Sequence, residues 1–361
     1  MLLPAPETDD GTVSVLIVGG GIAGLATARA LRARGIEARV LERAVSHSAR
    51  GTGVYLPANA VRAIGELGLS AGLAERAHRI SQQRFLDQRG RVLTEVDLND
   101  VWGATGPCLA LPHAALHDLL EDGLAVSRGS TITAIDAATA EHDLVVGADG
   151  LRSSIRASAF PRSGPRFLGQ VSWRFVDDHA AEVSAWTVWL GRRATFLAVP
   201  LGGGRTYCYA AVDRRTPSDP AGVEPSVLTG LFEGFAEPVP TLLAALSGSP
   251  YFSPIEEVVH EPWSRGRVVL VGDAAHAMSP NMAEGVGMAV EDALVLAETV
   301  AADRPLADFE TRRRPRVEFV QAQTHRRDRT RSLPPFVRDP VLRTAGQRIF
   351  RGNYQALTAA P

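Results

Sequence analysis

Short apolar runs, each followed by a turn rich in glycine or aspartate, occur at 13–18, 143–146 and 267–271. Runs of this length without polar alternation are typical of buried parallel strands. Residues 25–34 have apolar positions at helical spacing and stop before Gly35, a residue type common after helix C-termini. A strand at 37–41 follows. The chain therefore begins with a strand–helix–strand unit, and the fold class that we predict is α/β.

A second pattern, strands separated by turns of glycine, proline and aspartate, covers most of 166–261. It predicts a mostly antiparallel sheet with strands at 171–176, 185–190, 194–201 and 206–212, and a hairpin is predicted at 83–96. We expect one discontinuous Rossmann-like domain, an interleaved β-sheet domain and a basic tail. Their predicted bounds are 1–82, 100–165 and 262–333 for the first, 83–99 and 166–261 for the second, and 334–361 for the tail.

Composition narrows the classes of function. The chain has 361 residues and a net charge of −2, which argues against a nucleic-acid-binding protein. Its two cysteines, Cys108 and Cys208, fit no metal-ligand spacing, so we expect free thiols and no metal site. Since the N-terminus lacks a basic signal-peptide region and no apolar run reaches 18 residues, we expect a soluble, cytoplasmic protein without membrane contacts.

The first turn has the spacing Gly19-x-Gly21-x-x-Gly24 between a strand and a helix. In such a turn the first glycine permits the tight bend, the second lets a pyrophosphate approach the backbone, and the third lets helix and strand pack closely. The helix N-terminus adds unpaired N–H groups and a positive dipole end. Glu42 ends the second strand, where a carboxylate can accept both hydroxyls of a ribose. These features predict a dinucleotide site lined by Gly19, Gly21, Ile22, Ala23, Gly24 and Glu42.

The other two apolar runs end in comparable loops. One reads GADGLRSSIR from Gly147, with an Asp149-Gly150 turn before a basic helix start. The other reads GDAAHAMSPNMAEG from Gly272, with Asp273 directly after the strand. An acid at that position followed by small residues suits a hydroxylated ligand chain.

Taken together, these three loops resemble those of the single-component flavin monooxygenases of the para-hydroxybenzoate hydroxylase type. The three motifs occur in the order and spacing of that family along nearly the whole chain. Trp173-Arg174 and the 196–203 stretch also resemble the middle sheet of the family. The resemblance implies a Rossmann-like FAD-binding domain of this type, with FAD bound in an extended pose.

The resemblance also implies a place for each contact residue. Glu42 would hold the adenosine ribose, Asp149 and Gly150 would lie on the pyrophosphate side, and Asp273 would hold the ribityl hydroxyls. The residues expected near the phosphates or the flavin ring are Arg43, Arg50, Gly53, His113, Pro280, Gly285, Val286 and Gly287. Two positions depart from the family: His113 stands where an arginine is usual, and Ala283 replaces a common glycine.

The implied reaction begins with reduction of FAD by NAD(P)H. O2 then adds to give the flavin C4a-hydroperoxide, which hydroxylates or epoxidises an aromatic or polyketide-like small molecule of secondary metabolism. Tyr209 is the candidate for a catalytic side chain that orients a substrate hydroxyl. The aromatic residues expected as possible pocket linings are Trp186, Trp189, Phe196, Tyr207 and Tyr209. Hydroxylation or epoxidation, NADH or NADPH, and monomer or homodimer all stay open.

Three other classes remain as alternatives. The first is another flavoenzyme of this fold, such as a reductase, dehydrogenase or redox-neutral cyclase; a halogenase lacks support because its Trp-x-Trp-x-x-Pro signature is not found. The second is an NAD-dependent dehydrogenase that uses the first turn alone, and the third is a non-catalytic flavin-binding protein. His276 is interpreted as a packed motif residue, and the arginine-rich 312–331 stretch as an amphipathic, solvated helix.

Overall fold

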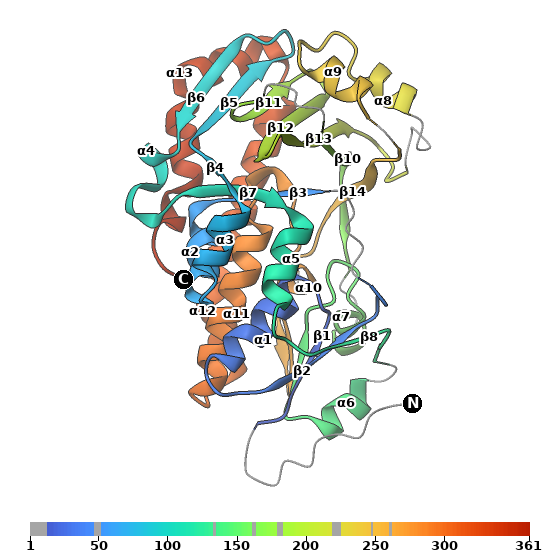
Figure 1. Cartoon of the computed structure of the whole chain (residues 1–361), viewed down its shortest axis with the longest axis vertical. Helices are drawn as coiled ribbons and strands as arrows, with labels where there is room; N and C mark the ends of the chain where they lie inside the picture. Colours follow the sequence, from blue (N-terminus) through green and yellow to red (C-terminus); the bar gives the residue numbers. More distant parts are fainter. Residues whose placement is uncertain are drawn as a thin grey trace.

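The computed structural model describes residues 13–46, 52–132, 135–160, 164–178, 183–218, 225–246, 248–259 and 262–361. Figure 1 shows two main sheets at opposite ends of the long axis, with long helices beside them. The predicted α/β class is confirmed. No helix within the described ranges is both long and apolar enough to span a lipid bilayer.

The parallel sheet has the strand order β15–β16–β9–β1–β2–β8. Its strands are β1 (Val15–Val18), β2 (Ala38–Glu42), β8 (Val126–Arg128), β9 (Leu144–Gly147), β15 (Ser264–Arg265) and β16 (Val268–Leu270). All neighbours pair in parallel except β15 with β16. β1, β9 and β16 are buried along their whole length, which explains why their sequences show no polar alternation.

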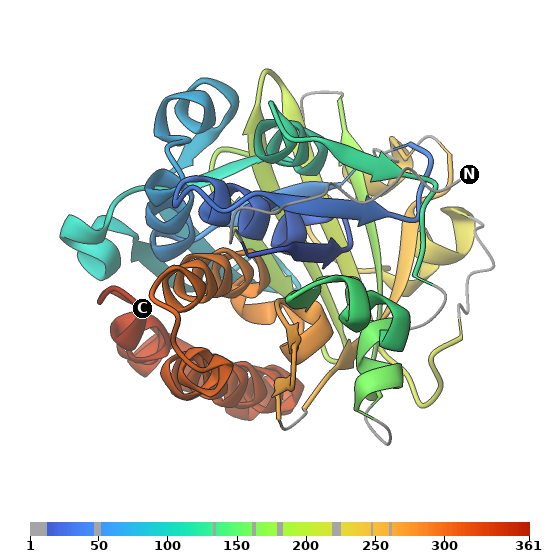
Figure 2. The same ribbon diagram turned by 90° about the horizontal axis from the view of Figure 1, so that it is seen from below.

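Helices cover this sheet and carry its turns. The predicted first helix is α1 (Ile22–Arg32), followed by Gly35 at φ +75°. It packs against α11 (Gly285–Ala301), which packs in turn against α12 (Leu306–Ser332). Figure 2, seen from below, shows α11 and α12 side by side. Since α11 is buried over most of its length, it forms the centre of this helical layer.

The larger sheet has the order β14–β10–β13–β12–β11–β5–β6. Its strands are β5 (Gln82–Asp87), β6 (Val92–Asp97), β10 (Arg166–Asp177), β11 (Trp186–Leu190), β12 (Ala194–Gly202), β13 (Arg205–Asp213) and β14 (Tyr251–Glu257). The pairing is antiparallel except between β11 and β5. The predicted antiparallel strands and the 83–96 hairpin are therefore present in one sheet.

One face of this sheet packs against α8 (Pro225–Leu231) and α9 (Val239–Ala244). The side chains on this face show that part of the predicted pocket lining was wrong. Trp189 and Phe196 point to this face, where the Phe196 ring lies 5.7 Å from the Phe232 ring. Because side chains alternate along a strand, the neighbours of Trp189 and Phe196 face the other way. Trp189 and Phe196 are therefore core residues, not pocket walls.

Within the described residues, the remaining strands β3 (Gly53–Leu56), β7 (Cys108–Pro112) and β4 (His78–Ile80) form a third sheet. The remaining helices are short apart from α13, and η denotes a 3₁₀ turn. Their bounds are α2 (Ala58–Glu66), α3 (Ser70–Arg76), α4 (Asn99–Trp102), η1 (Gly103–Thr105), α5 (His113–Glu121), α6 (Ile135–Glu141), α7 (Ser154–Ala159), α10 (Asp273–His276), η2 (Pro280–Met282), α13 (Pro335–Tyr354) and η3 (Gln355–Leu357).

The expectation of a C-terminal tail needs correction. Most of 334–361 is the helix α13, which packs along β6. A Cβ atom at Gly346 would come within 2.7 Å of Thr94, so the helix backbone lies directly on the strand. Phe350 and Tyr354 are buried. The basic residues of this segment therefore belong to an amphipathic helix, which composition alone does not distinguish from a solvated tail.

The arginine-rich helix α12 is also less solvated than predicted. Arg313 is fully buried and donates to Asp292 Oδ1 (2.9 Å), to Glu291 Oε2 (2.8 Å) and to the Met288 carbonyl (3.2 Å). Arg316 donates to both oxygens of Glu291. These contacts tie α12 to α11, and a buried arginine is tolerated there because its donors meet carboxylates.

We predict that Arg313→Met lowers the free energy of unfolding by about 3–5 kcal/mol, because two buried carboxylates lose a cation. Arg312→Met is the matched control, since Arg312 pairs with the exposed Glu298, and it should cost less than about 1 kcal/mol. Urea unfolding of both variants measures the difference. Equal losses in the two variants would contradict this account.

Candidate active site

The glycines of the first turn bring three backbone segments into contact. Gly19 has φ +115°, and a Cβ atom there would lie 2.2 Å from the Ala148 carbonyl oxygen. A Cβ atom at Gly24 would lie 1.9 Å from the Gly19 carbonyl oxygen. The first turn therefore touches both the end of β9 and its own helix, and no larger residue fits at either position.

Gly21 differs from these two glycines, because a Cβ atom there would meet nothing within 4 Å. It is the N-cap of α1 and has no side-chain capping bond. Ile22 and Ala23 follow as the first helical residues. The first N–H groups of a helix have no partner inside the helix, so this end of α1 presents open backbone donors beside an empty space.

Glu42 lies next to this turn at the end of β2. Its Oε2 accepts a hydrogen bond from the Gly20 N–H (2.7 Å), and its Oε1 accepts one from the Ala44 N–H (2.7 Å). The carboxylate is thereby held in one orientation. Arg43 is exposed beside it, and Arg50 lies outside the described residues.

The second turn joins the first. Asp149 Oδ2 accepts from the Ser154 N–H (2.7 Å) and hydroxyl (2.9 Å), so this carboxylate holds the start of α7. Gly150 has φ +79° and open space around it. Arg156 is buried and donates to the Ala274 carbonyl (2.8 Å), in the third motif. Asp149 and Arg156 thus shape the loop that Gly150 exposes.

The third turn completes the group. A Cβ atom at Gly272, which has φ +59°, would lie 2.8 Å from Ala23 Cβ. Asp273 begins α10 and is exposed to a cleft. His276 is buried, and its Nε2 lies 2.6 Å from Asp292 Oδ2, which also accepts from the Gly272 N–H. His276 is therefore a packed residue of the motif, as predicted from the sequence.

A cavity of about 880 Å³ adjoins these turns. It reaches the larger sheet, α12 and α13. The structure brings to its wall seven of the predicted site residues: Gly53, His113, Tyr209, Asp273, Pro280, Gly285 and Val286. Gly287 is not on this wall; a Cβ atom there would lie 2.9 Å from Glu284 Oε2 and 3.1 Å from Asn59 Nδ2. Some of the predicted residues therefore lie in the three contacting turns at 19–24, 147–150 and 272–273, the turn cluster, and others line the cavity.

Tyr209 is one of the polar groups that face the cavity. Its hydroxyl is buried and has no hydrogen-bond partner among the described residues. Burial raises the pKa of Tyr209 to about 12. The Arg174 guanidinium lies 5.6 Å from the centre of its ring. Tyr207 and Trp186 also line the cavity, as predicted.

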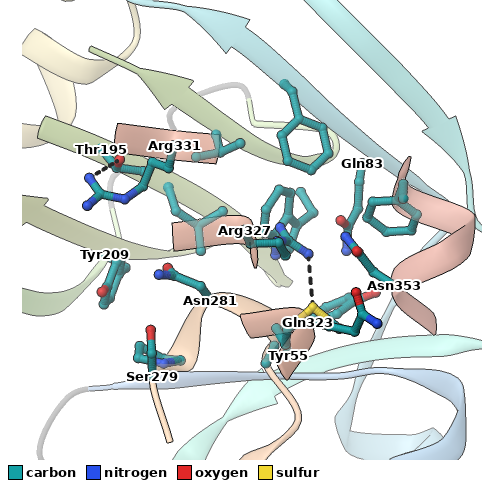
Figure 3. A pocket seen from close by; sticks show the side chains of 18 of the residues that line it. Tyr55, Gln83, Thr195, Tyr209, Ser279, Asn281, Gln323, Arg327, Arg331 and Asn353 are labelled. Carbon is teal, nitrogen blue, oxygen red and sulfur yellow. Dashed lines mark hydrogen bonds between the residues drawn. The ribbon is translucent and has the colours of Figure 1, made fainter. Parts of the chain in front are cut away.

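Sequence reasoning missed the wall that the C-terminal helices provide. Figure 3 shows Gln323, Arg327 and Arg331 of α12 and Asn353 of α13 facing the same space as Tyr209. The first three are spaced four residues apart, which places them on one face of a helix. That periodicity is the signal in the sequence that could have identified them.

Comparison with known proteins agrees with this arrangement. The family model described as "FAD binding domain" matches residues 12–133 and 113–321. Aurachin C monooxygenase/isomerase of Stigmatella aurantiaca is 32% identical over 325 residues, 81% of this chain and 82% of the relative. The 2-heptyl-3-hydroxy-4(1H)-quinolone synthase of Pseudomonas aeruginosa is 33% identical over 337 residues, 86% of this chain and 88% of the relative.

The chain belongs to the FAD-binding-domain family of flavin monooxygenases. The fold is that of Klebsiella pneumoniae HpxO, of which a single-substitution variant complexed with FAD gives a TM-score of 0.77 at 23% identity, over 96% of this chain and 94% of that chain. The protein is thus an FAD-dependent monooxygenase of the para-hydroxybenzoate hydroxylase type, an oxidoreductase for which NAD(P)H is the usual co-substrate. Another flavoenzyme of this fold, an NAD-dependent dehydrogenase and a non-catalytic flavin binder are therefore not favoured.

The loop at 280–285 of the monooxygenase contains a buried acid, Glu284. Glu284 is 1% exposed; its Oε2 accepts from Asn59 Nδ2 (2.9 Å), and its Oε1 has no partner among the described residues. Asn59 also reaches Glu291 Oε1 (3.3 Å). The pKa of Glu284 is raised to about 8: burial is the largest cause, the Asn59 hydrogen bond opposes it, and the charge of Glu291 adds to it. With this pKa, Glu284 is mostly protonated at pH 7.

We predict that Glu284 makes the stability of this monooxygenase depend on pH. Between its usual pKa of 4.5 and its folded pKa of about 8, unfolding releases a proton, because only the unfolded chain ionises. The free energy of unfolding therefore falls as the pH rises through this window and levels off above it. Glu284→Gln should remove this contribution, as measured by urea unfolding below, within and above the window.

Glu298→Gln serves as the matched control. Glu298 is exposed, and its hydrogen bonds with Arg312 and Arg304 lower its pKa, so it titrates below the window. This variant should keep the wild-type dependence on pH. A wild-type slope retained in Glu284→Gln would show that the buried acid is already ionised at neutral pH.

Proposed function

We propose that this monooxygenase binds FAD along the carboxyl edge of its parallel sheet and transfers oxygen to an aromatic small molecule in the adjoining cavity. One observation carries the proposal. Three turns from distant parts of the chain touch one another at that edge, through Gly19 with Ala148 and Gly272 with Ala23. The cavity begins at Asp273, directly beside this contact.

The residues present fit the adenine dinucleotide half of FAD. The open space at Gly21 and the uncapped start of α1 suit a pyrophosphate, which binds backbone N–H groups at a helix N-terminus. Gly150 offers a second open backbone position. Glu42 is held in place by two backbone donors, and each carboxylate oxygen can accept a further hydrogen bond from a ribose hydroxyl.

The cavity residues fit the flavin half. In this proposal Asp273 would hold the ribityl hydroxyls, and Pro280, Gly285 and Val286 would contact the ring; all four line the cavity. Gly53 begins β3 and His113 begins α5, and both line the cavity. The His113 N–H donates to the Thr52 carbonyl, which holds these two ends together. In this assignment the Rossmann-like strands form the FAD domain and the seven-stranded sheet forms the substrate domain. Asp149 acts indirectly, because it holds the start of α7.

Bound FAD supplies two-electron redox chemistry and the activation of O2. The chain must hold the substrate and exclude water. The walls from Trp186, Val188 and Leu197 are apolar, which favours an aromatic ring over bulk water. Since the pKa of Tyr209 is raised to about 12, its hydroxyl is protonated at neutral pH. This unpartnered hydroxyl can donate a hydrogen bond that orients a substrate oxygen.

The aromatic nature of the substrate is supported by the chemistry of the walls and of one relative. The Pseudomonas aeruginosa relative is named for a heptyl-substituted quinolone, a bicyclic ring system with an alkyl chain. A cavity of about 880 Å³ that also receives a flavin ring has room for a ligand of that class. An aromatic secondary metabolite is thus the substrate class that we propose, with hydroxylation as the reaction.

We predict that Gly21→Val weakens FAD binding by about tenfold or more, because the new side chain fills the phosphate space and blocks charge-assisted hydrogen bonds. The apoprotein should lose no more than about 1 kcal/mol, the cost of a poor N-cap. Titration of apoprotein with FAD and urea unfolding separate these effects. Gly24→Ala should instead destabilise the apoprotein, because its Cβ atom meets the Gly19 carbonyl at 1.9 Å.

We predict that FAD-loaded protein mixed anaerobically with NADPH or NADH loses the visible absorbance of oxidised flavin, and that admitted O2 restores it. A bound aromatic ligand should speed the loss. The measurement is stopped-flow absorbance. A flavin that neither nucleotide reduces, with or without aromatic ligands, would rule out NAD(P)H as the electron donor.

A further inference from the structure

Apolar side chains gather on the surface where α13 begins. Within the described part of the chain nine large apolar residues are exposed, and four of them fall between 333 and 341. These four are Leu333, Phe336, Val337 and Val341. A fifth, Val92, begins β6, the strand along which α13 packs. Single exposed apolar residues are common on proteins, whereas a group of them marks an interaction surface.

The helix itself shows the same feature in its periodicity. Arg338 and Leu342 form the inner side of the first turns of α13 and are buried. Phe336, Val337 and Val341 share the outer side, where a surface helix normally carries polar groups. Phe336 is 81% exposed, so water surrounds most of its ring. Covering this side with an apolar medium would therefore be favourable.

Two hydrogen-bonded arginines fix the surroundings of this apolar face. Arg331 donates to Asp213 Oδ1 (2.6 Å) at the end of β13. Arg338 donates to the carbonyls at 190 (2.9 Å) and 191 (2.6 Å), where β11 ends. The turn from α12 into α13 therefore lies between the end of β13 and the turn that joins β11 to β12. Figure 1 shows α13, β6 and β11 together at one end of the long axis.

The neighbouring ends of β11 and β13 are rich in positive charge. A hollow of about 460 Å³ there is lined by four arginines, Arg192, Arg193, Arg214 and Arg215. The acids on its wall are Asp213, which Arg331 already meets, and Glu233. Arg192 and Arg215 are exposed, and neither forms an ion pair with a described residue. Positive charge that the described protein leaves unbalanced therefore borders the apolar face.

Charge and shape together favour one occupant. A second copy bound about a two-fold axis would bring the arginines of the two copies together, and like charges repel. A protruding apolar segment flanked by arginines instead matches a lipid surface, where the apolar side chains enter the acyl boundary and the guanidinium groups meet phosphate headgroups. We propose that the face formed by 333–341 and the bordering arginines docks on an anionic phospholipid bilayer.

This proposal departs from the expectation of no membrane contacts, which rested on the lack of a long apolar run. A segment that lies on a bilayer needs no such run. Leu333 belongs to the exposed face and also lines the cavity. Docking would therefore bring the cavity wall close to the lipid, so that an apolar compound dissolved in the bilayer would lie near the cavity.

The test measures co-sedimentation of the FAD-loaded protein with lipid vesicles. One set of vesicles contains equal parts of phosphatidylcholine and phosphatidylglycerol, and the other contains phosphatidylcholine alone. We expect the wild-type protein to bind the anionic vesicles about tenfold more tightly, and added salt should weaken this binding because it screens the arginines. Equal binding to both sets, or binding to neither, would overturn the proposal.

A variant of the apolar face tests the insertion. Phe336→Ser should bind the anionic vesicles about tenfold more weakly, because the largest apolar side chain no longer enters the lipid. Val45→Ser is the matched control: Val45 is also 81% exposed, but it follows β2 in the parallel sheet. The control should bind as the wild type does. Full binding by Phe336→Ser, or an equal loss in both variants, would overturn the proposal.

A pair of substitutions tests the charge. Arg192→Gln combined with Arg215→Gln should weaken binding to the anionic vesicles about twentyfold, since each arginine near such a surface contributes roughly a factor of five. The control of equal charge change combines Arg34→Gln with Arg76→Gln, two exposed arginines near α1 and on α3. It should bind within about twofold of the wild type. Equal losses in the two double variants would reduce the effect to net charge and overturn the proposal.

FAD content and the thermal midpoint show whether each variant folds, and the comparison of the two vesicle sets needs only the wild type. A wild-type dimer that Phe336→Ser dissociates, without vesicle binding, would assign the face to a second copy and overturn the proposal. Analytical ultracentrifugation measures this. Vesicle binding requires no turnover, so its failure is distinguishable from failure of the proposed function.

Discussion

Direct backbone contact between three turns is the constraint on which the rest of the structure depends. Gly19 lies against the Ala148 carbonyl, and Gly272 lies against Ala23. At both places a Cβ atom would overlap a neighbour, so only glycine allows the carboxyl ends of β1, β9 and β16 to share one edge. The cofactor edge exists because these contacts leave Gly21 and Gly150 open beside them.

Buried ion pairs connect this edge to the C-terminal helices. Asp292 accepts from the Gly272 N–H in the third turn and from Arg313 on α12. Glu291, one residue earlier, accepts from Arg313 and Arg316. Because neighbouring acids on α11 bond to both the turn and α12, the position of the third turn depends on how α12 is docked. The same docking places Arg327 in the cavity wall.

The cavity is therefore a composite of elements that are distant along the chain. The turn after β16 supplies Asp273, the larger sheet supplies Tyr209, and α12 supplies Arg327. None of these elements encloses the space alone. A change of substrate could thus arise from α12 and α13 without altering the turn cluster, which is consistent with one fold serving many reactions.

The sequence by itself determined the local features: the glycine spacing, the buried strands, the hairpin, and the acids at strand ends. Each of these depends on neighbours within a few residues, where steric limits and hydrophobic periodicity act directly. Long-range packing decided the rest. Trp189 and Trp186 are both tryptophans, but their side chains lie on opposite faces of the sheet. Likewise Arg313 is buried, whereas its neighbour Arg312 is exposed. Whether a tryptophan lines a cavity or an arginine is buried depends on which distant element covers it, and only the tertiary structure provides that information.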